Sequence, residues 1–312
     1  MNPETTLTKE QIIEIFAEHK LAPISKIRRI TTGFTNEVYE VDEYILKVCG
    51  KSQAEHRFDQ EVYLYKVLQG IVRLPKVVAT DISRSIIDRR YMIYEKLKGN
   101  PLGSRWHLLT DSQREQIIKD LCNDLKLIDN FPYQDYAKTF NLDSHPVWSD
   151  VISEKFSDGL DKLKRIRVLG EDVLDTIQQY INKNQSVLEP QKLGLVYWDV
   201  QLDNIIVSDK DEYVGLIDFE NLMIASIDYR LFEVKVMSEH AQIFMAESLE
   251  LDAKIEDYKN LTKWYKKYYS ELFDFPELDT RIKLYELIDV LEKLPDWPTA
   301  HQLHERLENI IH

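Results

Sequence analysis

The sequence predicts an α+β protein with two lobes, a small one built on an antiparallel sheet and a larger helical one. Three observations support this prediction. Short β-rich runs dominate roughly the first third of the 312 residues, and long amphipathic helical patterns dominate the rest. A single strand-rich island at residues 193–219 interrupts those helices. Breaker chemistry at Lys98-Gly99-Asn100-Pro101 marks the boundary, so we expect lobes of residues 1–97 and 98–312.

The small lobe is expected to combine a sheet with one main helix. Cap chemistry at residues 6–10 precedes a short amphipathic helix that includes Ile12 and Phe16. The main helix, over residues 54–69, carries apolar side chains at helical spacing. Strands are expected over residues 24–30, 37–41, 44–48, 77–80 and 91–95.

The large lobe is expected to be helical apart from one β-hairpin. The apolar runs 204–207 and 213–217 flank a polar turn at residues 208–212, which is typical of a hairpin. Helices are expected over residues 111–129, 146–166, 171–184, 251–273, 279–293 and 298–311.

Composition excludes several classes of protein. Only 9 residues are glycine, and neither G-x-G-x-x-G nor a Walker-type phosphate loop can be drawn through them. The net charge of −14 argues against nucleic-acid binding and suits a cationic ligand if the charge is focused in a cleft. Cys49 and Cys122 are too few for a disulfide framework or a zinc cluster. With neither a signal-peptide pattern nor an apolar run of about 20 residues, we expect a cytoplasmic protein that does not cross a membrane.

The hairpin carries the first group of candidate functional residues. Asp199 and Asn204 belong to the segment that leads into its first strand, and Asp218 follows its second strand, so the three are expected to converge at one end. Two carboxylates and an amide oxygen suit Mg²⁺, and one carboxylate could act as a base in phosphoryl transfer. The alternative is that these are ordinary turn residues at strand ends.

The second group lies in the small lobe. Strict alternation in Ile45-Leu46-Lys47-Val48 points Lys47 away from its apolar neighbours, and Glu61 follows on the next helix. A strand lysine held by a helix glutamate is how kinases grip donor phosphates. The turn at residues 31–39 could lie over those phosphates. Two alternatives remain open: Lys47 as an edge-strand lysine that blocks aggregation, and Glu55 as its partner.

Motifs in this order resemble the aminoglycoside phosphotransferase/choline kinase family, small-molecule kinases with a protein-kinase-like fold. The motifs are TTGFTNEVYEV, ILKV, the helix with Glu61, YMIYEKLKGNPL, YWDVQLDNIIV and GLIDFE. The resemblance covers most of the chain. It implies a two-lobed protein-kinase-like fold whose helical lobe carries a catalytic β-hairpin.

The resemblance also implies roles for matching residues. In this resemblance Asp199 matches the family's catalytic base, and Asn204 and Asp218 match its Mg²⁺ ligands. Lys47 and Glu61 are similar to the pair that grips the donor phosphates. The implied reaction transfers the γ-phosphate of ATP or GTP to a hydroxyl of a small molecule. The acidic balance of the chain favours a cationic acceptor.

The linker between the lobes resembles the family's hinge. The backbone of Glu95 and Leu97 would meet the purine edge, and Tyr94 stands at the gatekeeper position. A bulky aromatic there resembles family branches that use GTP well, because it limits how deeply adenine can enter. The alternative is that Tyr94 points into the core with its hydroxyl bonded elsewhere.

Two departures from the family pattern support a second hypothesis. Tyr197-Trp198 stands where the family usually has His-Gly, and the family's later aspartate before leucine is missing, although Asp228 could substitute for it. A tyrosine hydroxyl can replace the histidine as a scaffold. The alternative function is therefore a catalytically impaired nucleotide-binding or regulatory protein.

Two further groups have simpler explanations. The aromatic run at residues 264–269 could form part of a cage for a quaternary ammonium, but a core stripe is the commoner explanation. His301 and His304 lie three residues apart beside Glu305, where a solvated helix face is expected rather than a metal site.

Overall fold

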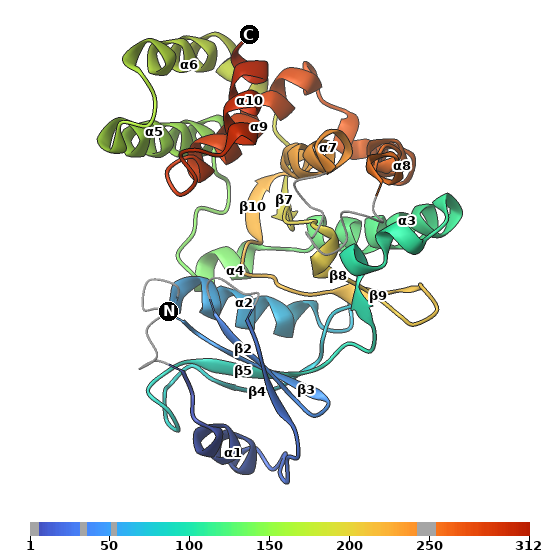
Figure 1. Cartoon of the computed structure of the whole chain (residues 1–312). Helices are drawn as coiled ribbons and strands as arrows, with labels where there is room; N and C mark the ends of the chain where they lie inside the picture. The colour runs from blue at the N-terminus through green and yellow to red at the C-terminus, as the bar shows by residue number, and fades with distance from the viewer. Residues whose placement is uncertain (1–5, 32–35, 51–54, 242–253) are drawn as a thin grey trace. The chain divides into compact units, whose positions relative to one another are not determined.

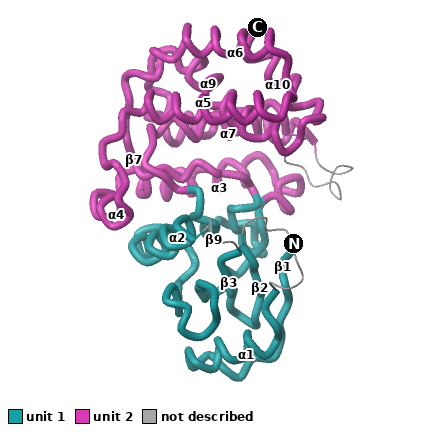
Figure 2. The backbone as a smooth tube through the Cα atoms, turned by 90° about the vertical axis from the view of Figure 1, so that its left-hand side faces the viewer, with its two compact units in different colours: residues 1–102, 203–221 teal, residues 103–202, 222–312 magenta. Residues whose placement is uncertain are grey.

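The computed structural model describes residues 6–31, 36–50, 55–241 and 254–312. The chain divides into two compact units (Figure 2). Unit 1 comprises residues 1–102 and 203–221, and unit 2 comprises residues 103–202 and 222–312. This division differs from the expected lobes of residues 1–97 and 98–312, because the hairpin segment groups with the N-terminal part of the chain.

A five-stranded antiparallel sheet forms the centre of unit 1, with the strand order β1-β2-β3-β5-β4. Its strands are β1 (Ile27–Ile30), β2 (Glu37–Val41), β3 (Tyr44–Val48), β4 (Val77–Asp81) and β5 (Tyr91–Glu95). Each overlaps an expected strand, because the β-rich runs are bounded by local turn signals.

One helix lies on each face of this sheet (Figure 1). Helix α1 (Lys9–Glu18) begins with a capping box between Thr8 and Gln11, and its Ile12 and Phe16 join the apolar cluster of one face. Helix α2 (Glu55–Leu68) lies on the other face and buries Glu61 and Tyr65 among apolar side chains. Side chains directed toward α1 therefore alternate along each strand with side chains directed toward α2.

The hairpin in unit 1 consists of β8 (Ile205–Val207) and β9 (Tyr213–Leu216), antiparallel as expected. Its first strand also pairs with β6 (Asn100–Pro101) at the end of the N-terminal segment. Gly215 allows close docking: a Cβ there would lie 2.5 Å from the carbonyl oxygen of Arg73, which also accepts a hydrogen bond from the Leu216 N–H at 2.9 Å. These backbone contacts explain why the hairpin belongs to unit 1.

Unit 2 is mainly helical. Its helices are α3 (Asp111–Asp129), α4 (Gln134–Thr139), α5 (Trp148–Ile166), α6 (Glu171–Asn184), α7 (Leu231–Glu239), α8 (Leu261–Tyr268), α9 (Leu278–Lys293) and α10 (His301–Ile311). Helix α9 buries most of its length and packs against α5, α6, α7 and α10. Strands β7 (Leu193–Val196) and β10 (Met223–Ser226) form a two-stranded antiparallel sheet.

The expected α+β class, with a small antiparallel sheet followed by a helical region, is confirmed. The helix expected over 251–273 is shorter: α8 is flanked by 3-10 turns at residues 255–257 and 270–273, and residues 251–253 lie outside the described part of the chain. Within the described residues, no helix is both long enough and apolar enough to cross a membrane.

Candidate functional site

Lys47 lies on the α2 side of the sheet. On β3 and β5, Ile45 faces Tyr94 and Lys47 faces Met92 across the ladder, so these four side chains share one sheet face. Leu46 and Val48 of β3 point the other way, into the apolar cluster around α1. The alternation expected from the sequence therefore holds. Only 6% of the Lys47 side chain is exposed.

Three carboxylates surround the Lys47 ammonium. Its Nζ lies 2.8 Å from each carboxylate oxygen of Glu61, 3.0 Å from Oδ1 of Asp218 and 3.7 Å from Oε2 of Glu220. Glu55, the alternative partner, instead forms ion pairs with Arg84 and Arg90. The structure thus pairs Lys47 with Glu61, one of the two carboxylates that the sequence left open.

The surroundings shift the protonation equilibria of this cluster. Burial lowers the pKa of Lys47, but Glu61, Asp218 and Glu220 outweigh that effect and hold the pKa well above its usual value. Burial raises the pKa of the Glu61 carboxyl to about 7, and Lys47 offsets only part of this shift. Lys47 therefore stays charged, and a proton taken up by the cluster at lower pH resides on a carboxylate.

The end of the hairpin brings Asp218 to this lysine. The carbonyl oxygen of Asn204 accepts a hydrogen bond of 3.0 Å from the Ile217 N–H, which places Asn204 and Asp218 at the same end of the hairpin. Asp218 has a φ of +63°, in the left-handed region that few residues other than glycine adopt. Its backbone N–H donates to the Tyr65 hydroxyl at 3.1 Å.

Glu220 and Asn36 are site residues that the sequence analysis did not select. The Asn36 amide donates to Glu220 at 2.7 Å and accepts a hydrogen bond from the Gly50 N–H at 3.3 Å. It therefore joins the residue just before β2 to the segment after β9. The signal was present, since Glu220 is two residues from Asp218. The tip of the expected phosphate turn, residues 32–35, lies outside the described residues.

The donor set suits a hard divalent cation. Carboxylate oxygens of Glu61, Asp218 and Glu220 lie within 4.8 Å of one another in the described part of the chain. Asp218 is the most open of these carboxylates, with 39% of its side chain exposed. Oxygen donors of this kind, with the Asn204 amide at the same hairpin end, are the ligands that Mg²⁺ prefers.

The three residues expected at the purine edge lie at the end of β5 and just beyond it. Tyr94 is buried, and its ring stacks on that of Tyr65 with centroids 5.6 Å apart and planes at 13°. Burial raises the pKa of its hydroxyl above the usual value. Glu95 is exposed and donates its backbone N–H to the carbonyl oxygen of Lys76 at 2.9 Å, and Leu97 is half-buried beyond the strand. Their roles at the purine stay predictions.

Asp199 lies in unit 2, in the segment that follows β7. The preceding Tyr197 is fully buried, and Trp198 packs its ring on those of Tyr229 and Phe232 with centroids 5.9 Å and 5.8 Å away. Because Asn204 and Asp218 belong to unit 1, the convergence of Asp199 with them stays a prediction.

Asp228 is bound mainly by residues of α9. Within the described residues its carboxylate accepts hydrogen bonds from Arg281 and Tyr285 of α9 and from Ser226. These bonds anchor α9, and a supporting role of Asp228 near Asp199 stays a prediction. Arg230, which stands before Leu231 where the family commonly has an aspartate, pairs with Asp129.

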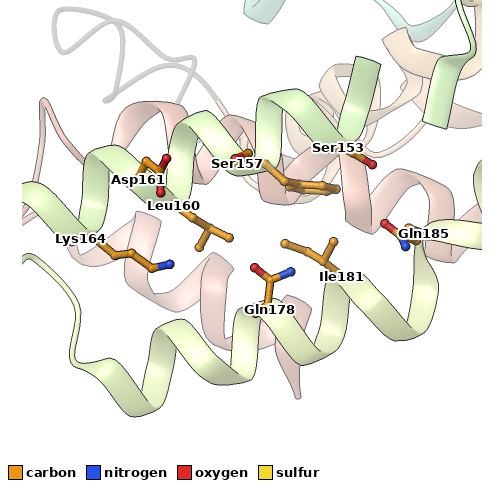
Figure 3. Close-up of a pocket in the computed structure, with 9 residues that line it drawn as sticks. Ser153, Ser157, Leu160, Asp161, Lys164, Gln178, Ile181 and Gln185 are labelled. Atoms are coloured by element: carbon orange, nitrogen blue, oxygen red, sulfur yellow. The ribbon is translucent and has the colours of Figure 1, made fainter. Parts of the chain in front are cut away.

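The remaining candidates have structural roles. Trp264, Tyr265 and Tyr269 are buried, as expected for a core stripe, whereas Tyr268, also expected in it, is half-buried and donates its hydroxyl to Glu115 at 2.9 Å. Side chains of α5, of α6 and of the turn after it line an open pocket of about 220 Å³, among them Leu160 and Ile181 (Figure 3). It contains none of the expected site residues.

The chain is similar to known proteins in sequence and in fold. Residues 26–255 match the family model described as "Phosphotransferase enzyme family". No curated protein matches the sequence.

Several solved structures share the fold. The ADP-bound aminoglycoside phosphotransferase APH(2'')-Ib is 18% identical, with a TM-score of 0.69 over 98% of this chain and 97% of its own. The complex of APH(2'')-IIIa with GDP and kanamycin is 17% identical, with a TM-score of 0.71 over 97% of both chains. A thermostable mutant of APH(4)-Ia, in a ternary complex with AMP-PNP and hygromycin B, is 16% identical, with a TM-score of 0.65 over 96% of this chain and 97% of its own.

Proposed function

Because the chain belongs to the phosphotransferase enzyme family, we propose that it transfers the γ-phosphoryl group of ATP or GTP to a hydroxyl of a small molecule. One observation carries this proposal: a buried lysine held between Glu61 and Asp218 at 2.8 Å and 3.0 Å. A strand lysine paired with a helix glutamate is the arrangement with which kinases orient donor phosphates, and the aspartate after the hairpin is the residue with which they hold Mg²⁺.

Each candidate residue has a distinct part in this reaction. Lys47 binds the donor phosphates, and Glu61 keeps its ammonium in place. Asp199 accepts the proton of the acceptor hydroxyl as that oxygen attacks the γ-phosphorus. Asn204 and Asp218 are the residues that would hold Mg²⁺. When bound, Mg²⁺ neutralises charge on the phosphate oxygens.

Substitution of the base tests the proposed function. We expect Asp199→Asn to reduce kcat by about 10²–10⁴-fold, the usual contribution of general-base catalysis, with nucleotide affinity nearly unchanged. Turnover of a panel of hydroxyl compounds and nucleotide binding by calorimetry measure the two effects. Asp209→Asn, in the exposed hairpin turn, is the control. A rate within about tenfold of the wild type would contradict the role of Asp199.

The acceptor we favour is cationic. The net charge of −14 supports this choice, as do the aminoglycosides bound in two of the similar structures. A screen of amino-bearing, neutral and anionic hydroxyl compounds tests it. Turnover confined to neutral or anionic compounds would reject a cationic acceptor and leave the phosphotransferase proposal intact.

A catalytically impaired nucleotide-binding protein is the second candidate. It is favoured by Tyr197-Trp198 before Asp199, in place of the family's usual His-Gly. The same assay separates the two functions, because an impaired protein binds nucleotide but turns over no acceptor of the panel.

The choice of donor tests the position of Tyr94. We expect GTP to support turnover at least as well as ATP, because the bulky ring at the end of the pocket limits how deeply adenine enters. Tyr94→Ala is then expected to shift preference toward ATP. Matched kcat/KM values with both donors decide it. Strong ATP preference in the wild type, unaltered by the substitution, would reject this role.

A further inference from the structure

Tyr65 and Glu61 lie four residues apart on α2 and hold adjacent peptide groups of the segment after the hairpin. The Tyr65 hydroxyl accepts a hydrogen bond from the Asp218 N–H at 3.1 Å, and Oε1 of Glu61 accepts one from the Phe219 N–H at 3.3 Å. Residues four apart share one face of a helix, so α2 presents both acceptors to this segment together. Glu61 also binds Lys47, whereas Tyr65 has no part in the proposed reaction.

We propose that Tyr65 is a positioning residue for the metal-binding carboxylate of Asp218, acting through the hydrogen bond from the Asp218 N–H to its hydroxyl. This inference rests on the proposed function, because it assumes that Asp218 takes part in binding the metal–nucleotide complex.

The backbone of Asp218 requires such support. A φ of +63° places it in the left-handed region, where a residue with a side chain has a conformational cost that surrounding contacts offset. The carboxylate is 39% exposed and is held from the side-chain end by Lys47 at 3.0 Å. The hydrogen bond to Tyr65 holds the same residue from its backbone, so the carboxylate stays aimed while Lys47 engages phosphates.

The Tyr65 ring is itself fixed by two aromatic neighbours. Tyr94 stacks on it at 5.6 Å, and Phe219 meets it edge-on at 5.1 Å with an interplanar angle of 63°. The side chain is fully buried, so the ring has no room to move. A neutral hydroxyl on an immobilised ring is a fixed acceptor for a backbone N–H.

This packing connects the nucleotide pocket with the metal ligand. Tyr94 is the residue expected at the purine, and it is linked to Asp218 through one intervening ring. Tyr94→Ala is therefore expected to increase the Mg²⁺ requirement as well as to change the donor preference. A residue that only closed the purine pocket would change the donor preference alone.

Tyr65→Phe tests the inference, because it removes one oxygen and keeps the packing of the ring. The matched control is Tyr44→Phe, the same deletion on a half-buried tyrosine of β3 that packs toward α1. Amide hydrogen exchange in the free protein is the first measurement. We expect the Asp218 amide to exchange about threefold to tenfold faster, the equivalent of one net hydrogen bond, and the Phe219 amide to change less. Unchanged exchange at Asp218 would overturn the assignment of this hydrogen bond.

Nucleotide binding titrated with Mg²⁺ is the second measurement. We expect Tyr65→Phe to raise the Mg²⁺ concentration needed for half-maximal binding by about threefold to tenfold and to leave metal-free nucleotide affinity unchanged. The Tyr44→Phe control should match the wild type in both. Equal Mg²⁺ requirements in wild type and Tyr65→Phe would overturn the positioning role alone. A wild-type protein that bound no nucleotide would overturn the proposed function, while amide exchange would still report on the contact.

Discussion

Two clusters of buried charged side chains, one in each unit, differ in their net charge. In unit 1 one ammonium, that of Lys47, faces the carboxylates of Glu61, Asp218 and Glu220. Among the described residues of unit 2, the Arg281 guanidinium pairs with the carboxylate of Asp228, and neither side chain is exposed at all. The first cluster has excess negative charge and an open member, whereas the second is neutral and closed.

The two clusters also differ in how fully their polar atoms are hydrogen-bonded. Arg281 donates to Asp228 at 2.7 Å and 3.2 Å and to the carbonyl oxygens of Val187 and Pro190 at 2.6 Å and 3.1 Å. Tyr285 and Ser226 complete the set around Asp228. A buried ion pair with its polar atoms satisfied fixes structure and offers nothing to a ligand. A cluster with surplus carboxylates and a partly exposed aspartate has oxygen atoms left with which to bind a cation.

The largest effect on stability is expected from breaking the closed cluster. Arg281→Met leaves Asp228 buried without its counter-charge, and the free energy of unfolding should fall by about 3–5 kcal/mol. Urea denaturation measures this loss. Arg28→Met is the control, because Arg28 is 61% exposed and its ion pair with Glu40 should contribute less than about 1 kcal/mol. A loss at Arg281 no larger than at Arg28 would show that the closed cluster is not structural.

Breaking the open cluster should affect activity more than stability. Lys47→Met is expected to lower turnover by about 10²–10³-fold, the usual cost of losing one fixed electrostatic group. Its stability loss should be smaller than that of Arg281→Met, because Glu61, whose pKa is raised to about 7, can take up a proton. Steady-state kinetics and urea denaturation check both parts. Lys66→Met, at an exposed position of α2, should change neither.

Glu233 is a third buried carboxyl group. Its pKa is shifted although it is not one of the candidate site residues. Glu233 of α7 is 2% exposed, and its Oε1 makes no hydrogen bond within the described residues. Burial raises its pKa to about 8; Asp289 and Asp199 add to the shift, whereas Lys293 and Arg306 oppose it.

The folded state therefore holds a proton that the unfolded state has already released, and stability falls as pH rises from about 4.5 to about 8. Glu233→Gln removes this dependence and should raise the free energy of unfolding at pH 8 by about 2–4 kcal/mol relative to its effect at pH 5. Urea denaturation at the two pH values measures the difference. An equal effect of the substitution at both values would contradict the shifted pKa.

The smallest effect is expected at Glu55, the partner that Lys47 does not use. Glu55 pairs with Arg84 and Arg90 near the surface, so Glu55→Gln should change the free energy of unfolding by less than about 1 kcal/mol and leave turnover within about twofold. Glu61→Gln, on the same helix, should reduce turnover strongly. Equal losses in both variants would contradict the pairing of Lys47 with Glu61.

Local patterns in the sequence determined the regular elements and half of the site. Helices α3 and α6 have the bounds that periodicity predicted, and all five strands of the main sheet overlap their predicted ranges. Alternation on β3 and helical spacing on α2 brought Lys47 and Glu61 to one face of the sheet. These features depend on neighbours a few residues away, which is the range that periodicity and capping report.

Periodicity in the sequence indicated neither helix α7 nor the shortened bounds of α8. Residues of α7 are buried on most of its surface, from Leu231 to Met237, so the helix lacks the polar stripe that reveals an amphipathic pattern.

Only the tertiary structure decided which unit the hairpin joins, what Asp228 binds and which residues hold Asp218. Each depends on contacts between residues far apart in sequence: Asn100 with Val207 in the ladder, Asp228 with Arg281, and Tyr65 with Asp218. A tyrosine on a helix, or an aspartate just before one, can form hydrogen bonds with many different partners, so its residue type and local position do not determine which one it uses. The packing of elements selects one of them, because a buried hydrogen-bonding group must find its partner wherever the fold places it.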